Sequence, residues 1–288
     1  MTPFLRAIVH PPRKPAWLHW SIRLGRILGL WYLFTVLFTW LVADTLTFPI
    51  PPTSYQTVPG QMEFQAEDGT PLIGCWLPQE QSNAPTILFF HGNGEDLGHL
   101  QPFLRSLQGL GVNLFAYDYR GYGRSGGQPT ERGLYRDAEA AYRLVTETLG
   151  IAANNLFLFG RSLGSGSACY LAAQHSVAGL ILDSPFTSTF RVVLPFPPLP
   201  NDQFPNLRRL RHIRAPILLI HGTRDEVVPF SHGERLARAA QSPVETFWIE
   251  GAGHNNLVAS AGQGYWDRIR DFINRHRCTQ GERGSPRL

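Results

Sequence analysis

The apolar run Leu156–Phe159, followed by Gly160-Arg161-Ser162-Leu163-Gly164, decides the fold. Such a run predicts a buried strand, and the glycine-flanked serine after it predicts a sharp turn from the strand into a helix. The glycines suit this turn, because a serine at its apex has a strained backbone and a Cβ on either side would collide with the neighbouring strand or helix. Small residues continue after the turn, so the positive end of the helix can lie close beneath Ser162. We therefore expect Ser162 to present its hydroxyl as a nucleophile.

A nucleophilic serine needs a base that takes its proton and an acid that orients the base, and after such a turn the acid precedes the base in the chain. Asp225 lies in a polar turn after the apolar strand 216–220. His254 lies in a glycine-containing loop after the strand 245–250, where the glycines let the imidazole swing back over the sheet. We predict Asp225 as the acid and His254 as the base. Asp183, which ends the preceding strand, is the alternative acid.

Acyl transfer also needs hydrogen-bond donors for the oxyanion of its tetrahedral intermediate. The apolar run 86–90 breaks into His91-Gly92-Asn93-Gly94, in the position typical of an oxyanion loop. We predict that the backbone N–H groups of Asn93 and Leu163 form the oxyanion hole. His91 is expected to make a structural hydrogen bond to this loop.

Strands and helices alternate along the chain, which predicts an α/β fold with a mostly parallel sheet covered by helices on both faces. Met62–Glu67 and Leu72–Leu77 are expected to form an antiparallel edge hairpin. Thr130 is a predicted N-cap. The helix after it carries apolar residues at helical spacing, namely Leu134, Ala138, Ala141, Val145 and Leu149. The other predicted helices are 97–108, 163–174, 231–240 and 264–275. One domain, 60–278, holds these elements, and 279–288 is a tail.

These motifs, with the turn Tyr117–Ser125 and the segment Asp183–Ser188, together resemble α/β-hydrolases of the serine-aminopeptidase-like group. Residues 60–276 are similar to single-pass membrane hydrolases related to bud-emergence proteins and protein depalmitoylases. The resemblance implies the α/β-hydrolase fold with an eight-stranded sheet, and the site roles given above. The chain departs from the depalmitoylases, which carry a lipidated N-terminal cysteine cluster, because it has no cysteine before Cys75. In the Tyr117–Ser125 turn, Asp118 and Arg120 are expected to be loop scaffolding.

The segment 184–213 is expected to form a short lid, because its many prolines exclude long helices. The segment is strongly apolar, and Phe186, Phe190 and Phe196 are candidates to line a substrate pocket. An apolar mouth would suit an acyl chain or a lipid-like substrate. The same residues would equally serve to pack the loop onto the domain.

The N-terminus predicts a membrane anchor. Residues 27–43 carry no charge, and at about 1.5 Å per helical residue they nearly span a hydrocarbon core of about 30 Å. The expected arrangement is a basic cytoplasmic leader (1–26), a transmembrane helix (27–46) and a Pro-rich linker (47–59). Basic residues before the uncharged run 27–43 and Asp44 after it place the N-terminus in the cytoplasm and the catalytic domain on the periplasmic or extracytoplasmic side. A cleaved signal peptide, which would release a secreted protein, is the alternative.

Composition narrows the possible ligands. The net charge is +4, but five of the 26 basic residues and none of the 22 acidic residues precede Ala43. The remaining 21 basic residues nearly balance the acidic ones, so nucleic-acid binding is not expected. No metal-ligand spacing is present, and we expect neither a metal nor another cofactor. Cys75 and Cys169 are expected to be small buried hydrophobes.

The sequence therefore predicts a serine hydrolase that cleaves carboxylic esters or thioesters through an acyl-enzyme, on a small-molecule or lipid-like acyl substrate. Two alternatives remain open. One is an amidase or peptidase of the same fold, and the other is a non-enzymatic, membrane-tethered binding protein.

Overall fold

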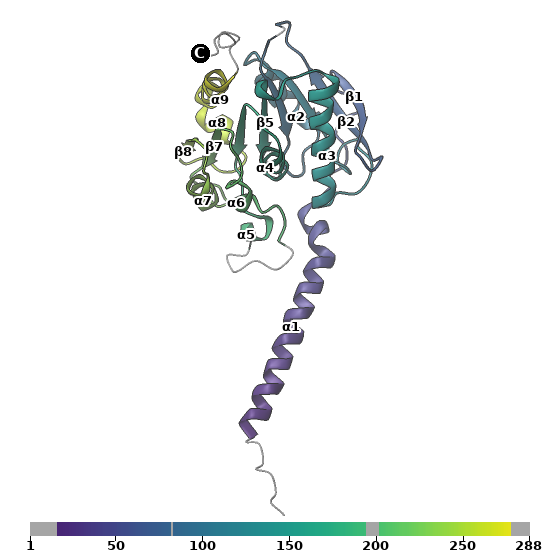
Figure 1. The fold of residues 1–288 in the computed structure, drawn as a ribbon, viewed down its shortest axis with the longest axis vertical. Helices are drawn as coiled ribbons and strands as arrows, with labels where there is room; N and C mark the ends of the chain where they lie inside the picture. Colours follow the sequence, from purple (N-terminus) through teal and green to yellow (C-terminus); the bar gives the residue numbers. More distant parts are fainter. Residues whose placement is uncertain (1–15, 82, 194–201, 278–288) are drawn as a thin grey trace, which may run out of the picture. The chain divides into compact units, whose positions relative to one another are not determined.

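The computed structural model describes residues 16–81, 83–193 and 202–277. The chain divides into two compact units, residues 1–43 and 44–288. Figure 1 traces the elements along the chain. The strands are β1 (Gln61–Gln65), β2 (Pro71–Leu77), β3 (Thr86–Phe90), β4 (Asn113–Tyr117), β5 (Leu156–Arg161), β6 (Gly179–Asp183), β7 (Ile217–Gly222) and β8 (Val244–Ile249). The α-helices are α1 (Ala16–Thr47), α2 (Leu97–Gln108), α3 (Glu131–Arg143), α4 (Gly164–Gln174), α5 (Thr189–Val193), α6 (Asn206–Arg209), α7 (Ser231–Ala239), α8 (Leu257–Ala261) and α9 (Gln263–His276).

The strands form one eight-stranded sheet in the order β1-β2-β4-β3-β5-β6-β7-β8. β1 pairs antiparallel with β2, and β2 antiparallel with β4. The pairs from β4 through β3, β5, β6 and β7 to β8 are all parallel. This arrangement confirms the predicted mostly parallel sheet and its antiparallel edge hairpin. The crossovers place the carboxyl ends of the parallel strands, including the one that leads into Ser162, at one edge of the sheet.

Each face of the sheet has its own apolar core, because successive strand residues point to opposite faces. In β5, Leu158 belongs to the core shared with helices α3, α4 and α7. Its neighbours Phe157 and Phe159 belong to the core shared with α2, α8 and α9. The side chains of the run Leu156–Phe159 are all fully buried. A continuous apolar run is what a central strand covered on both faces requires.

The four longer helices predicted besides α3 agree closely with their bounds in the structure, whereas α1 begins at Ala16, well before the predicted span 27–46. The helix α2 has the bounds predicted, and the Thr130 side chain caps α3 by accepting a hydrogen bond from the Gly133 N–H at 3.0 Å. The stripe on α3 faces the core. Two other differences lie outside the predicted lid. After Arg143 the helix widens into a π-helical turn over Leu144–Thr148, and α8 was not predicted, because five residues are too short to show a period.

The described parts of the predicted lid hold two short helices, α5 and α6. Phe186 is 4% exposed and packs against Phe204, with 6.2 Å between ring centroids. Phe190 lies half-buried at the start of α5. Phe196 lies outside the described residues. Phe186 is therefore buried in the core, as expected if it packs the loop onto the domain, which was one of the two alternatives that the sequence allowed.

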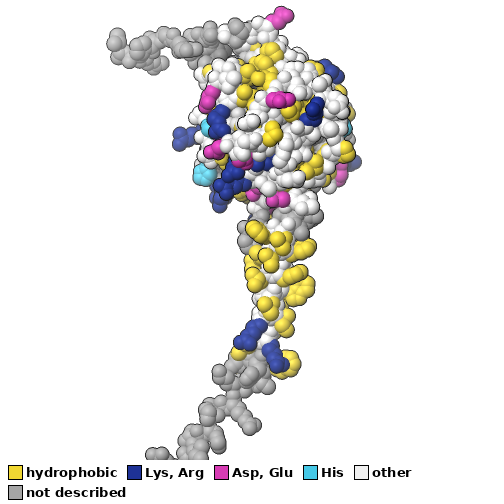
Figure 2. Space-filling view, turned by 90° about the vertical axis from the view of Figure 1, so that its right-hand side faces the viewer, with side chains coloured by type: hydrophobic (Ala, Val, Ile, Leu, Met, Phe, Trp, Pro, Cys, Tyr) yellow, Lys and Arg dark blue, Asp and Glu magenta, His cyan; other side chains and the backbone are white. Residues whose placement is uncertain are grey.

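The helix α1 is apolar and exposed in the part that lies within the first unit. Its stretch Trp20–Leu41 has a mean hydropathy of 1.5, and it is the helix among the described residues that is long and apolar enough to cross a membrane. Figure 2 shows apolar side chains along the viewed face of this helix. None of the residues in this stretch is buried.

Candidate active site

Ser162 sits on the turn between β5 and α4, as the sequence predicts. Its φ is +47°, a left-handed backbone conformation that non-glycine residues rarely adopt. The flanking glycines are sterically required. A Cβ on Gly160 would lie 2.6 Å from the Gly164 oxygen, and a Cβ on Gly164 would lie 2.1 Å from the Phe90 oxygen. The turn is therefore held tightly between β3 and α4, with the Ser162 side chain at its apex.

The structure brings Ser162, His254 and Asp225 together from three separate loops. The His254 Nε2 atom lies 3.0 Å from the Ser162 Oγ, and the Nδ1 atom lies 2.8 Å from the Asp225 Oδ2. Since the carboxylate is an acceptor, Nδ1 carries the proton and Nε2 is left to accept from the serine hydroxyl. This is the geometry of a nucleophile, a base and an orienting acid.

Asp225 is fixed by more donors than His254 alone. Its Oδ1 atom accepts the N–H groups of Val227 at 2.9 Å and Val228 at 2.7 Å. The His221 Nε2 lies 3.2 Å from Oδ2 and 2.9 Å from the Val228 oxygen, so its proton is shared between the two acceptors. Burial disfavours the carboxylate, but the hydrogen bonds from His221 and His254 outweigh burial and hold the pKa of Asp225 below its usual range. Asp225 therefore stays ionised beside the imidazole.

The alternative acid, Asp183, is engaged elsewhere. Its Oδ2 atom accepts the Tyr265 hydroxyl at 2.6 Å, and burial raises the pKa of this carboxyl. Glu226, the neighbour of Asp225, accepts the backbone N–H of His254 at 3.3 Å. Asp225 is thus the carboxylate that the structure places against the His254 ring.

The loop after β3 lies beside the serine. A Cβ on Gly92 would be 3.8 Å from the Ser162 Cβ. Among the described residues, no group accepts a hydrogen bond from the backbone N–H of Asn93 or of Leu163, so both donors are available. His91 is buried, and its Nδ1 lies 2.8 Å from the Gly92 oxygen. Burial lowers the pKa of His91, so the ring is a neutral structural donor, as expected.

Two groups that were not predicted from the sequence, Glu95 and His221, support this site. Glu95 accepts the Gly92 N–H at 2.8 Å and pairs with Arg161 at 3.1 Å, so one carboxylate ties the loop after β3 to the residue before Ser162. His221 holds Asp225. Two sequence signals point to these contacts. One is the opposite charge on two loops that follow neighbouring strands, and the other is a histidine at the end of the strand that carries the acid.

Asp118 and Arg120 make scaffold contacts, as predicted. Arg120 pairs with Asp137 at 2.7 Å and with Asp68 at 2.9 Å. Asp118 accepts the Leu97 N–H at 2.8 Å at the start of α2. Both residues are buried, and their contacts hold the Tyr- and Gly-rich turn to the edge hairpin and to α2.

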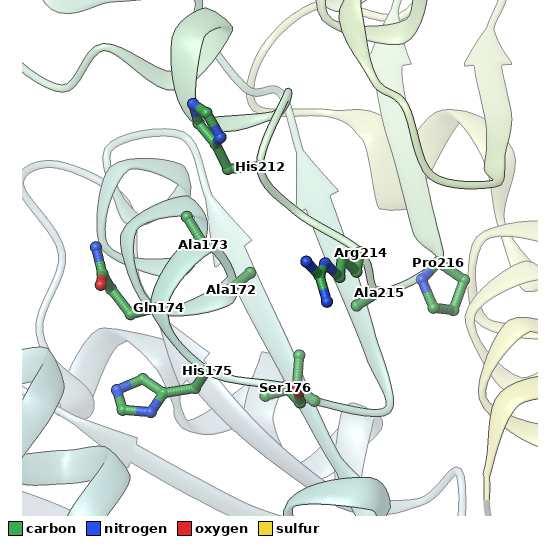
Figure 3. Close-up of a pocket in the computed structure, with 10 residues that line it drawn as sticks. Ala172, Ala173, Gln174, His175, Ser176, His212, Arg214, Ala215 and Pro216 are labelled. Carbon is green, nitrogen blue, oxygen red and sulfur yellow. The ribbon is translucent and has the colours of Figure 1, made fainter.

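A pocket of about 550 Å³ lies away from this site. Figure 3 shows its lining, which includes His175, Ser176 and Pro216. Ser176 and Pro216 precede β6 and β7, so the pocket lies at the amino ends of the parallel strands. Ser162 follows the carboxyl end of β5, at the opposite edge of the sheet. None of the three linked side chains lines this pocket.

Comparison with known proteins identifies the family. Residues 81–200 match the model of the family described as serine aminopeptidase, S33. The human alpha/beta hydrolase domain-containing protein 17B is 43% identical over 206 residues, which cover 70% of this chain and 71% of the relative. The 17C protein of Xenopus tropicalis is 40% identical over 215 residues, covering 73% of this chain and 68% of the relative.

Solved structures share the fold. The esterase Pf2001 of Pyrococcus furiosus superposes with a TM-score of 0.69 at 19% identity, over 81% of this chain and 99% of that one. An α/β-hydrolase of Vibrio vulnificus superposes with a TM-score of 0.59 at 26% identity, over 74% of this chain and 80% of that one. The chain is therefore a hydrolase of the serine α/β-hydrolase superfamily, and it belongs to the family of the α/β-hydrolase domain-containing 17 proteins.

Proposed function

We propose that the protein is a membrane-anchored serine hydrolase that cleaves carboxylic ester or thioester bonds. The observation that carries this proposal is the hydrogen-bonded series from Ser162 through His254 to Asp225, with the serine on a strained turn. No metal or other cofactor has a part in the reaction, because nucleophile, base and oxyanion donors all come from the chain.

In the first half of the reaction the Ser162 Oγ attacks the carbonyl carbon of the substrate, and His254 Nε2 takes the hydroxyl proton. The carbonyl oxygen becomes an oxyanion, which accepts the N–H groups of Asn93 and Leu163. The tetrahedral intermediate then collapses. The bond to the alcohol or thiol breaks, and His254 returns its proton to the leaving group. The product is an acyl-enzyme on Ser162.

In the second half, water attacks the acyl-enzyme carbonyl while His254 takes one of its protons. The second tetrahedral intermediate collapses, the Ser162 oxygen leaves with the proton from His254, and a carboxylic acid is released. Asp225 stabilises the imidazolium in both halves without accepting its proton. The lowered pKa of this carboxyl supports that role, since the carboxylate stays negative while the ring is positive.

The substrate is proposed to be a small or lipid-like acyl compound. The support is the apolar character of the lid segment, of which Phe190 is half-buried. Phe186 is buried in the core, so its contribution to a pocket would be as the floor beneath a bound acyl chain. Phe196 remains a candidate from the sequence alone.

The test is hydrolysis of p-nitrophenyl esters from acetyl to palmitoyl by the full-length protein in detergent. Wild type is expected to turn these esters over with a preferred chain length, and Ser162→Ala is expected to reduce kcat by at least about a thousandfold. Ser167→Ala is the matched control, because it removes a buried hydroxyl from α4, the helix that follows Ser162. The oxygen of this hydroxyl has no hydrogen-bond partner among the described residues. Equal rates in wild type and Ser162→Ala would refute the mechanism.

An amidase or peptidase is the second candidate, and the serine aminopeptidase family model favours it. An amide leaving group is poorer than an alkoxide or thiolate, so p-nitroanilides discriminate the two. We expect anilide turnover far below ester turnover. Comparable rates on both would assign the chain to amide hydrolysis.

We also propose that α1 anchors the protein, with the N-terminus in the cytoplasm and the catalytic domain outside it. The support is the exposed apolar stretch Trp20–Leu41, preceded by basic residues. The mass of the mature protein in the membrane fraction distinguishes this arrangement from a cleaved signal peptide. A reporter that is active only outside the cytoplasm, fused after the last helix, tests the orientation.

A further inference from the structure

The residues that end α1 lie against the candidate active site. We call Asp44–Phe48 the connecting segment, and all of it belongs to the larger compact unit. Thr47 is 6% exposed and Phe48 is 4% exposed. The sequence predicts the end of the span and the beginning of a linker here, but the side chains of Thr47 and Phe48 are as buried as those of the core. A segment that only connected α1 to the rest of the chain would not need to bury these two side chains.

The first contact of the connecting segment is with the predicted oxyanion loop. The Asn93 Nδ2 atom donates to the Thr47 carbonyl oxygen at 2.7 Å. On the other side of the same amide, the Tyr122 hydroxyl donates to the Asn93 Oδ1 at 2.7 Å. The Asn93 side chain is therefore held from two directions. Since the backbone N–H of this residue is a proposed oxyanion donor, Thr47 helps to fix the position of that donor.

The second contact is with Gln203, which lies just before α6. The Thr47 hydroxyl donates to the Gln203 Oε1 at 2.9 Å, and the Gln203 Nε2 donates to the Asp44 Oδ1 at 2.6 Å. The Gln203 backbone oxygen in turn accepts the Thr189 N–H at 2.9 Å, at the start of α5. Gln203 thus joins the connecting segment to the start of α5.

The third contact leads to the helix that follows Ser162. Phe48 packs edge-on against Phe204, with 6.1 Å between ring centroids. Phe204 lies directly on the first turn of α4, because a Cβ on Gly166 would be only 2.3 Å from its ring. Phe204 also has a φ of +52°, an unusual conformation for a phenylalanine that its surroundings must enforce. Phe48 is one of the residues that surround Phe204.

We propose that the connecting segment is a positioning element of the active site: Thr47 and Phe48 order the oxyanion loop, the residues Gln203 and Phe204, and the helix that follows the nucleophile. This inference rests on the proposed function. Misplacing a catalytic group by about 1 Å can cost about a hundredfold in rate, so loops that carry backbone donors need support from neighbouring residues. The end of α1 supplies that support. A cleavage after Phe48 would remove it, so the proposal favours an anchor that remains attached.

The experiment uses the full-length protein in detergent and two variants, Thr47→Val and Phe48→Ala. Thr47→Val keeps the side-chain shape but loses the hydrogen bond to Gln203, and Phe48→Ala removes the contact with Phe204. Each is expected to lower kcat for a p-nitrophenyl ester by about three- to tenfold, with KM within about twofold. The rate at which a fluorophosphonate labels Ser162 should fall in parallel.

Two matched controls separate positioning from general stability. Phe64→Ala removes a phenylalanine that packs edge-on against Phe115 and Tyr117 at the far edge of the sheet. Thr146→Val removes a hydroxyl that donates to the Tyr142 oxygen. Both controls are expected to lower the melting temperature at most and to leave kcat as in wild type. Unchanged kcat in Thr47→Val and Phe48→Ala, with active wild type, would overturn the proposal.

Amide hydrogen exchange provides a readout that does not depend on catalysis. In Thr47→Val and Phe48→Ala, residues 91–96 and 202–206 are expected to exchange faster than in wild type, and in the controls they are not. If wild type shows no Ser162-dependent hydrolysis or labelling, the proposed function fails. The exchange data then decide separately whether the connecting segment orders these loops, and unchanged exchange would overturn that as well.

Discussion

Replacing Gly164 by alanine tests how tightly the turn at Ser162 is built. The new Cβ would lie 2.1 Å from the Phe90 oxygen, 2.6 Å from the Phe90 carbon and 2.8 Å from the His91 oxygen. Ordinary contact begins at 3.4 Å. All three atoms are backbone, so no side chain can rotate away. The helix α4 and the strand β3 must therefore separate by about 1 Å or more, an overpacking that costs roughly 1–3 kcal/mol in the free energy of unfolding.

The same movement carries Ser162 away from its base. The Ser162 Oγ and His254 Nε2 atoms are 3.0 Å apart, and a displacement of about 1 Å breaks this hydrogen bond. We expect kcat for a p-nitrophenyl ester to fall on the order of a hundredfold. Urea unfolding measures the loss of stability, and initial rates at saturating ester measure kcat.

Gly264→Ala is the matched control. Gly264 is also in the first turn of a helix, α9, but a Cβ there meets nothing within 4 Å. This substitution should raise stability by roughly 0.5–1 kcal/mol, because alanine restricts the unfolded chain and favours the helix. The reasoning is refuted if Gly164→Ala unfolds at the wild-type urea concentration and keeps the wild-type kcat.

Two further predictions concern buried carboxyl groups. Burial raises the pKa of Asp118 to about 7, so its stabilising contribution is complete below the unfolded value of about 4 and is lost as the pH rises through 7. Stability should therefore fall by a few kcal/mol between pH 4 and pH 8, and Asp118→Asn should flatten this dependence in urea unfolding; parallel profiles would contradict it. Tyr265→Phe removes the hydroxyl that donates to the buried Asp183 and should cost about 1–3 kcal/mol, seen as a lower melting temperature. A wild-type melting temperature would speak against this hydrogen bond.

Periodic apolar residues made much of the fold predictable. The helix α2 buries Leu97, Leu100, Leu104 and Leu107, whose spacing marks one face of a helix over twelve residues. The buried strands likewise appear as short apolar runs bounded by polar turns. The helix α8 has five residues and buries Leu257, which is too little to define a period. The local sequence pattern does not mark the π-helical turn over Leu144–Thr148 that follows α3.

For the site as well, some residues could be predicted from the sequence and others could not. Ser162 and His254 have glycines close to them, and Asp225 lies in a polar turn. Both features are typical of strained or exposed loops at strand ends, so these three residues could be predicted from the sequence. The pairing of Glu95 with Arg161 depends on β3 lying beside β5, which is a property of the strand order. The opposite charges of the two residues are visible in the sequence, but the residues around each of them do not show that the two loops meet.

In the lid and the connecting segment, the composition of the sequence does not show which contacts the side chains make. Apolar composition shows that a side chain will leave water, but not what will cover it. Phe186 was a candidate for an acyl pocket, and it packs against Phe204 in the core. The sequence predicts Thr47 as the first residue of a linker, whereas Thr47 contacts Gln203 and Asn93 across a long separation in the chain.

The order of the strands has a consequence for how the enzyme would fail under stress. Ser162 follows β5, whose core residues are fully buried, whereas His254 follows β8, which forms the sheet edge with mostly half-buried residues. Edge strands open in local fluctuations that cost less free energy than global unfolding. When β8 frays, the imidazole withdraws while the serine stays in place on a folded core. Inactivation is then a local, reversible event that comes before loss of the fold, and the turnover lifetime of the protein depends on its edge rather than on its centre.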